Sequence, residues 1–358
     1  MCTLGKEENK CSDLKVHTKT MHASKQETYL GDKLDQRGIL KPTIESRTGN
    51  GYGAIANILA ILDQLPLGHW RVQAGLELRQ ALFLNAVLFN SEAWQGIVDS
   101  DIEVLEKANE VLLRGIIHGH SKAPPVSLYL ETGSVPIRYI LKNRRLSYLK
   151  NILQRDSEEL ISEIFAAQKE DPNDGDFCKL VDEDAKQVNL VLNEHEIAMM
   201  KAKQYKNKFK GLVKDAAFQY LIQMKTKHSK MSQVTYNNLS LQAYMQSPLF
   251  TAQDAAILFS LRTRTVRGIK DDFRHMYSDN KCPLQCGSID TLQNILTCTA
   301  LQTNIESSLL THNQVKYEHI FSQDIIKQKE ATETFKHLLM VHEKLINNLP
   351  VSETGPVH

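Results

Sequence analysis

The feature that most constrains this chain is a group of thiols in its C-terminal third. Three of the six cysteines, Cys282, Cys286 and Cys298, fall close together in the sequence. The first two flank a proline-containing turn, and the third lies in an apolar run, 292–301, that predicts a short helix. A structural zinc site needs four such ligands in a tetrahedron. The segment is therefore predicted to fold as a small zinc-knuckle-like module with these three cysteines as metal ligands.

The fourth ligand is missing from this pattern. Asn294 stands one helical turn before Cys298 and on the same face, where a histidine would complete the set. An amide is a poor zinc ligand, so water, His275 or His312 would have to serve in its place, with weaker binding. The alternative is that the cysteines are ordinary reduced thiols in a helical core.

The segment 261–298 also carries a collinear set of residues around these cysteines: Leu261, Arg262, Thr263, Arg264, Ile269, Lys270, Phe273, Tyr277, Pro283, Asp290 and Thr291. Together they resemble the C-terminal knuckle of non-LTR (LINE-type) retrotransposon reverse transcriptases. The family pattern has two residues between the first two cysteines and a histidine at the place of Asn294. Here three residues separate the cysteines and the histidine is gone, so the resemblance implies a degenerate zinc site in a copy that has drifted.

Two β-prone segments, 14–17 and 28–34, flank a polar connection near the N-terminus and predict a short β-hairpin. In the resemblance, these segments look like the end of the palm and the primer-grip hairpin, which would hold the 3′ end of the growing strand. The implied grip residues are Tyr29, Leu30, Gly31 and Asp32. The resemblance also implies that the chain begins after the catalytic palm and that Met1 opens a truncated copy.

From Lys41 onward, apolar residues recur at helical spacing. The glycine cluster 49–53 lacks the Lys-Ser/Thr ending of a phosphate loop and is interpreted as a flexible or closely packed helix start. The predicted fold class is mainly α, with a short N-terminal β-hairpin followed by a multi-helix thumb and linker and a small Cys-containing knuckle. The resemblance implies five parts: the end of the palm with the grip hairpin at 1–40, a helical thumb at 41–122, a basic helical linker at 123–250, the degenerate knuckle at 251–301 and a helical tail at 302–358.

Basic residues gather in two predicted helices. The segment 136–155 carries arginines and lysines without one acid, which suits a phosphate-backbone track, although the acidic segment 156–184 could neutralise it. A lysine-rich stretch from 201 on, interleaved with aromatic residues, suits single-stranded or structured RNA and equally suits an ordinary surface helix. The candidate nucleic-acid-binding residues are Arg138, Lys142, Arg144, Arg145, Lys206, Lys210, Arg262, Arg264 and Lys270.

Polymerisation needs carboxylates that hold two magnesium ions. The Asp271-Asp272 pair lacks the aromatic-Ala lead-in of the family's catalytic turn and is interpreted as a solvated pair, so no catalytic residue and no magnesium site are predicted within this chain. The net charge of +1 does not by itself indicate a polyanionic partner. Without a membrane-length apolar run or a signal peptide, we expect no membrane partner and an intracellular location, nuclear or cytoplasmic.

Two functions from different classes are consistent with these observations. The first is a reverse-transcriptase-derived protein that binds RNA or DNA without a polymerase centre, inactive alone or acting with a separate catalytic chain. The second is a helical structural or interaction protein whose nucleic-acid function has lapsed.

Overall fold

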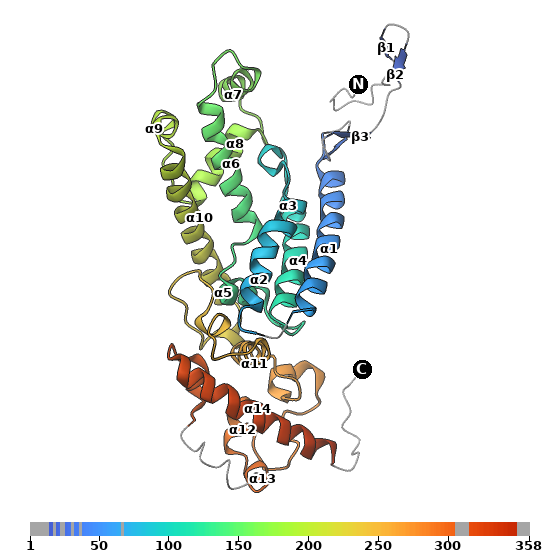
Figure 1. Ribbon diagram of the computed structural model, residues 1–358, viewed down its shortest axis with the longest axis vertical. Helices are drawn as coiled ribbons and strands as arrows, with labels where there is room; N and C mark the ends of the chain where they lie inside the picture. Colours follow the sequence, from blue (N-terminus) through green and yellow to red (C-terminus); the bar gives the residue numbers. More distant parts are fainter. Residues whose placement is uncertain are drawn as a thin grey trace. The chain divides into compact units, whose positions relative to one another are not determined.

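The structure is a computed structural model that describes residues 14–16, 19–21, 26–29, 32–35, 38–65, 68–304 and 315–348. Helices make up most of these residues, and short antiparallel strand pairs precede them (Figure 1). The predicted fold class, mainly α with a short N-terminal β-hairpin and a cysteine cluster, is therefore confirmed. None of the helices formed by the described residues is both long and apolar enough to cross a membrane.

The N-terminal strands form two hairpins. Strand β1 (Leu14–Val16) pairs with β2 (Lys19–Met21), and β3 (Gln26–Tyr29) pairs with β4 (Asp32–Asp35), both antiparallel. The predicted strands at 14–17 and 28–34 thus do not pair with each other. The second of them supplies the end of β3 and the start of β4, so each strand pairs with its nearest neighbour along the chain, which closes the shortest loop.

The chain divides into two compact units built from alternating segments. The first contains the residues through Ile61, Glu77–Leu112 and Val135–Gln219, and the second contains Leu62–Leu76, Leu113–Ser134 and the residues from Tyr220 on. Helices that cross a boundary are grouped below with the unit that holds most of their residues.

The first unit contains the hairpins and most of the long helices (Figure 1). Its core side chains come largely from the apolar stripes of these helices, as the periodicity predicts. The elements after the strands are α1 (Lys41–Asp63), the π-helical turn η1 (Arg79–Phe83), α3 (Leu84–Val87), the 3₁₀ turn η2 (Ser91–Ala93), α4 (Asp99–Ile116), α6 (Ile137–Leu153), α7 (Leu160–Glu170), α8 (Phe177–Gln187), α9 (Glu194–Met199) and α10 (Ala202–Lys225).

The glycine cluster lies inside α1, so the expectation that it starts a helix is wrong. Close packing is observed instead: a methyl group placed on Gly51 would lie 2.4 Å from Cγ1 of Val87 and 3.3 Å from the Phe83 ring. The glycine lets the two helical segments approach within the first unit, which offsets its low helix propensity.

The second unit holds the candidate knuckle. Its long helix α14 (Ile325–Asn347) packs against α11 and α12, and Asp324 caps its N-terminus by accepting hydrogen bonds from the backbone of Ile326 and Lys327. The elements are α2 (Arg71–Leu78), α5 (Pro125–Thr132), the 3₁₀ turns η3 (Ser229–Met231) and η4 (Ala243–Met245), α11 (Ala252–Thr263), η5 (Lys270–Met276), α12 (Leu292–Thr297), α13 (Thr299–Gln302), η7 (Tyr317–Phe321) and α14.

Candidate functional site

The three cysteines of the predicted knuckle converge in the second unit. The Sγ atoms of Cys282, Cys286 and Cys298 all lie within 4.8 Å of one another, and those of Cys282 and Cys298 are 3.9 Å apart. Cys282 and Cys298 are buried, and Cys286 is half-buried. A group of side chains that could hold a metal ion is therefore present where the sequence predicts it.

A closed turn brings the first two cysteines together. The backbone N–H of Cys282 donates to the carbonyl of Ser288 at 2.9 Å, and that of Gln285 donates to the carbonyl of Cys282 at 3.0 Å. The spacer of three residues between Cys282 and Cys286 thus still forms a turn with both sulfurs on one side.

The predicted helix at 292–301 is interrupted at the third cysteine. Cys298 is extended, with φ −67° and ψ 112°, and it separates α12 from α13. Its carbonyl accepts from the backbone of Leu301 and Gln302 at the start of α13. The interruption accompanies the inward position of the Cys298 sulfur beside that of Cys282.

Position 294 contacts the sulfur cluster through Cys286, although α12 ends before Cys298 and the two residues do not share a continuous helix. Thr291 caps α12 by accepting from the backbone N–H of Asn294 at 3.0 Å. The Asn294 side-chain oxygen and nitrogen lie 3.6 and 3.7 Å from Sγ of Cys286. An amide thus occupies the place where the resemblance implies a histidine.

A second group of candidate ligands shares one cysteine with the first. Ligand atoms of Cys282, Asp290 and His342 also lie within 4.8 Å of one another, and all three residues are buried. Oδ1 of Asp290 and Nε2 of His342 are 3.9 Å apart, and neither atom has a hydrogen-bond partner. Asp290 comes from the segment just before α12, and His342 comes from α14.

Sequence reasoning missed His342 as a candidate ligand. It named His275, which is exposed and belongs to neither group, and His312, which lies outside the described residues. The available signal was the position of His342 four residues after Leu338 and seven after Phe335, on the apolar stripe of the tail helix, where a polar residue needs a partner.

The thiols differ in acidity. Burial raises the pKa of Cys282 to about 12 and also raises that of Cys298. Burial opposes ionisation of Cys286 as well, but hydrogen bonds from the Ser288 backbone and from the neighbouring side chains outweigh it and lower its pKa to about 7. Cys286 is therefore the most readily ionised of the three thiols, and a bound metal ion would displace the remaining protons.

The predicted basic residues of α6 have partners within the first unit. Arg145, buried, donates to Asp184 at 2.6 and 2.9 Å, and Lys142 donates to the same carboxylate at 3.2 Å. Burial lowers the pKa of Lys142, while Asp184 opposes that shift. This is the alternative in which the acidic segment 156–184 neutralises the basic helix.

The other two predicted residues of α6 lie close to carboxylates as well. Arg138 lies near Asp99 and Glu106, at 3.9 and 4.0 Å, and Arg144 donates to the carbonyl of Leu88 and lies 3.6 Å from Glu92. The basic helix is thus largely engaged within its own unit.

Arg262 belongs to a buried network in the second unit. Its Nε donates to Oε1 of Glu131 at 2.8 Å, and the two side chains are 1% and 0% exposed. The hydroxyls of Tyr236 and Tyr244 donate to the same carboxylate at 2.6 and 2.9 Å, and burial raises the pKa of both tyrosines well above its ordinary value. The burial of Arg262, like that of Arg145, argues against contact with a phosphate backbone.

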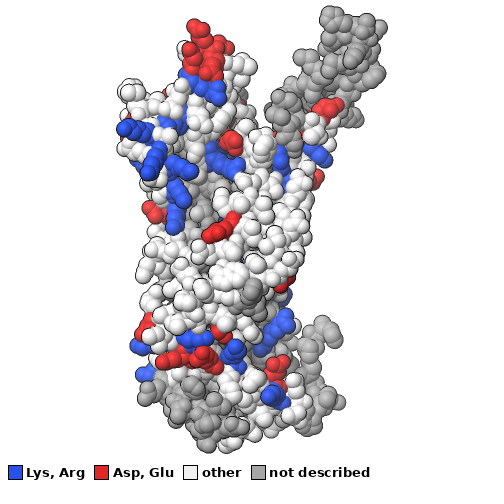
Figure 2. Space-filling view, in the orientation of Figure 1, with Lys and Arg blue, Asp and Glu red and all other residues white. Residues whose placement is uncertain are grey.

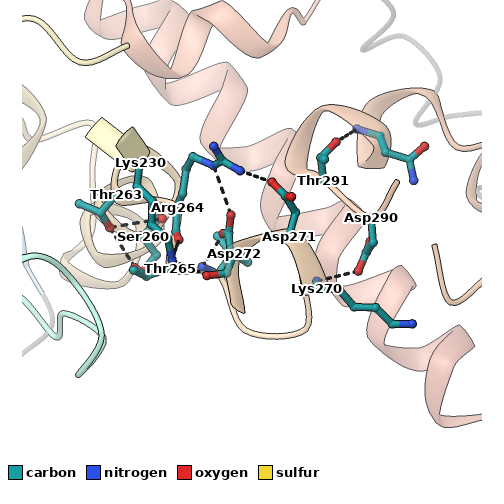
Figure 3. A network of polar contacts seen from close by, with 12 residues as sticks. Lys230, Ser260, Thr263, Arg264, Thr265, Lys270, Asp271, Asp272, Asp290 and Thr291 are labelled. Carbon is teal, nitrogen blue, oxygen red and sulfur yellow. Dashed lines mark hydrogen bonds and ion pairs between the residues drawn. The ribbon is translucent and has the colours of Figure 1, made fainter. Parts of the chain in front are cut away.

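Arg264 lies over the Asp271-Asp272 pair (Figure 3). It donates to Asp271 and lies 3.4 Å from Asp272, whose other oxygen accepts from the backbone of Val266 at 3.2 Å. Both aspartates are buried, so the interpretation of a solvated pair is wrong: they hold the segment after α11 in place. Burial raises the pKa of Asp272 to about 6 against the opposing effect of these donors.

Lys270 also has a carboxylate partner. Its Nζ lies 2.9 Å from a carboxylate oxygen of Asp279. Its backbone N–H donates to Asp290 at 2.8 Å (Figure 3). The second bond uses Oδ2 of Asp290 and leaves Oδ1 beside His342.

The lysine-rich start of α10 is exposed. Lys203, Lys206 and Lys210 project to solvent, and Lys and Arg side chains gather over α9 and α10 in the surface view (Figure 2). The interleaved rings face inward: Tyr205 and Phe209 are buried, with ring centroids 4.0 Å apart. These two rings therefore do not form a stacking platform for bases.

Two of the four predicted grip residues, Tyr29 and Asp32, lie in strands of the second hairpin. Leu30 and Gly31 lie outside the described residues, and Tyr29 ends β3. Asp32 starts β4, where its carboxylate accepts from Arg47 at 2.7 Å and from Asn90 at 3.4 Å. These contacts fasten the hairpin to the helices of the first unit.

Comparison of the chain with models of known protein families, with curated proteins and with solved structures finds no match. The functional interpretation therefore depends on the sites themselves.

Proposed function

We propose that this protein binds nucleic acid, with RNA as the first candidate, and does not polymerise it. The observation that carries the proposal is the exposed lysine face of α10. Lys203, Lys206 and Lys210, which are exposed, and Lys214, which is half-buried, are spaced by three and four residues and so share one side of the helix, with no acidic residue between 202 and 214. Such a face suits the phosphate backbone of a single strand.

The resemblance to non-LTR reverse transcriptases supports the same proposal. It likens parts of this chain to the thumb, linker and knuckle of such an enzyme. The chain would then hold template RNA or target DNA, and any DNA synthesis would be carried out by a separate catalytic chain.

The proposal is tested by neutralising two lysines of α10. Lys206→Gln with Lys210→Gln removes two exposed charges, and Lys107→Gln with Lys186→Gln is the matched control on exposed positions of the same unit. Binding to a fluorescent single-stranded RNA is titrated at several salt concentrations. If both lysines contact phosphates, the affinity falls. The slope of log affinity against log salt concentration then shrinks by about 1.4, at about 0.7 for each contact with a single strand.

The control variant should bind like the unaltered protein. Equal losses in both variants would indicate a general effect of net charge, and no binding at low salt would refute the proposal. The second outcome would favour the helical interaction protein, an alternative supported by the internal ion pairs of Lys142, Arg145 and Arg262.

We further propose that the cysteine cluster holds a structural zinc ion. Zinc binds thiolates at about 2.3 Å in a tetrahedron, which places two sulfurs about 3.8 Å apart. The distance of 3.9 Å between the sulfurs of Cys282 and Cys298 fits this requirement. The expected result is one zinc per chain by elemental analysis and its loss on Cys282→Ser; a purified, reduced protein that takes up no zinc would refute it.

A further inference from the structure

We infer that His342 is the fourth ligand of this metal centre, so that a Cys3His site joins the tail helix α14 to the knuckle. The inference rests on the proposed zinc ion. The two groups of candidate ligands share Cys282, with the other cysteines in one group and His342 with Asp290 in the other. Sγ of Cys282 therefore has ligand atoms of both groups within 4.8 Å.

The burial of His342 favours a ligand role. The residue is 2% exposed, and its Nε2 has no hydrogen-bond partner. A buried polar atom without a partner costs on the order of 1–3 kcal/mol. Coordination to zinc would satisfy Nε2 through the lone pair that a neutral imidazole offers.

Asp290 is the competing donor on the same side. Its Oδ1 is also buried without a partner, but its Oδ2 already accepts from the backbone of Lys270 at 2.8 Å. Three thiolates with one imidazole are a common ligand set of closed structural zinc sites. We therefore assign the coordination to His342 and place the Asp290 carboxylate beside the imidazole.

The movement required at the shared sulfur is small. In a tetrahedral site the Cys sulfur and the His nitrogen stand about 3.5 Å apart, given bonds of about 2.3 and 2.0 Å. Sγ of Cys282 and the nearest ring nitrogen of His342 are within 4.8 Å. The helix α14 also packs against α12 and α13, which lie on either side of Cys298.

The inference assigns the fourth ligand to a different helix from the one that the spacing indicates. Asn294, on α12, contacts Cys286, whereas His342 approaches Cys282. In this chain the histidine would thus come from the tail, some four dozen residues beyond the position at which the resemblance places it.

The inference is tested by zinc affinity in matched variants of the full chain. His342→Gln removes the ligand, His337→Gln is the control on the same helix, and Asp290→Asn tests the competing donor. In competition with a chelator, we expect His342→Gln to lower zinc affinity at least about tenfold, the lower end of the loss seen when even an outer partner of a ligand is removed. Asp290→Asn should lower it less, and His337→Gln should leave it unchanged.

Cobalt substitution identifies the donor set directly. Cobalt(II) bound to the unaltered protein should give the visible absorption of a tetrahedral site with three thiolates and one nitrogen, and His342→Gln should change that spectrum. In His342→Gln, the second change Asn294→His should restore affinity from the α12 side. If His342→Gln binds zinc as tightly as the unaltered protein, the assignment of His342 is overturned, while the proposed zinc centre stands. The same holds if Asp290→Asn loses more zinc affinity than His342→Gln.

A measurement on the unaltered protein covers the case in which His342→Gln does not fold. Amide hydrogen exchange of α14 is compared with zinc bound and after chelation. If His342 coordinates the ion, chelation should lower protection in the last turns of α14, as well as in the knuckle. Loss of protection in the knuckle alone would overturn the inference, and absence of zinc from the unaltered protein would refute the zinc proposal itself.

Discussion

Replacement of Arg262 by methionine tests whether a predicted nucleic-acid contact is a structural residue. The side chain of Glu131 is 0% exposed, and in the variant it loses its cationic partner. Breaking a buried ion pair by removing one partner costs about 3–5 kcal/mol. Because Tyr236 and Tyr244 still donate to the carboxylate, we expect the lower end, about 3 kcal/mol. For a unit of this size that corresponds to a fall in melting temperature of about 6–12 °C.

The assay is thermal and urea unfolding followed by circular dichroism, with RNA binding measured at a temperature where the variant is folded. The double variant Glu131→Gln with Arg262→Met removes both charges and should recover most of the lost stability, since no unpaired buried charge remains. The reasoning would be refuted if the free energy of unfolding of Arg262→Met lay within about 0.5 kcal/mol of that of the unaltered protein, as for an ordinary surface substitution, and RNA binding were weakened.

Three further outcomes are expected. Burial opposes ionisation of Asp254, but two lysines of α14 and the Thr251 backbone outweigh it and hold the pKa of this carboxyl at about 2. Asp254→Asn should therefore lower the free energy of unfolding by about 2 kcal/mol at neutral pH. This difference should be present above pH 4 and lost as pH falls from about 4 to 2, and a difference that does not depend on pH would contradict the prediction. Gly133→Ala should lower the free energy of unfolding in urea by about 2–5 kcal/mol, because the position has φ +65° and a Cβ there would lie 2.3 Å from the Ser240 carbonyl carbon. Gly211→Ala is the control: this glycine lies on a helix with open space around it, so the substitution should not destabilise the protein, and equal effects of the two substitutions would contradict the prediction. Purified protein should not extend a primed RNA template with magnesium or manganese, and extension that is abolished by mutations in this chain would show a polymerase centre that we did not identify.

The helical architecture could be predicted from the sequence because it follows from local periodicity. Helical spacing of apolar residues from Lys41 onward predicts helices there, and the structure has α1 at Lys41–Asp63 and α4 at Asp99–Ile116. Strand pairing was harder to predict, since a short β-prone segment such as 28–34 does not show by itself that its two ends belong to different strands.

The convergence of Cys282, Cys286 and Cys298 was also predictable, because their spacing is short. The partners of Arg262 and the position of His342 were not. Glu131 lies 131 residues before Arg262 along the chain, and nothing in the local pattern around either residue indicates the other. The basic residues of α6 show the same limit, since Asp184 reaches Arg145 only through tertiary packing.

The buried Glu131 has a consequence for the order in which the chain acquires structure during synthesis. On the ribosome this glutamate emerges more than a hundred residues before each of its three donors, Tyr236, Tyr244 and Arg262. Until the last of them leaves the exit tunnel, an ionised carboxylate on α5 gains nothing by leaving water. We expect the second unit to close late and in one step, after the first unit has all of its sequence available, and therefore to be the part of a nascent chain that depends most on chaperones.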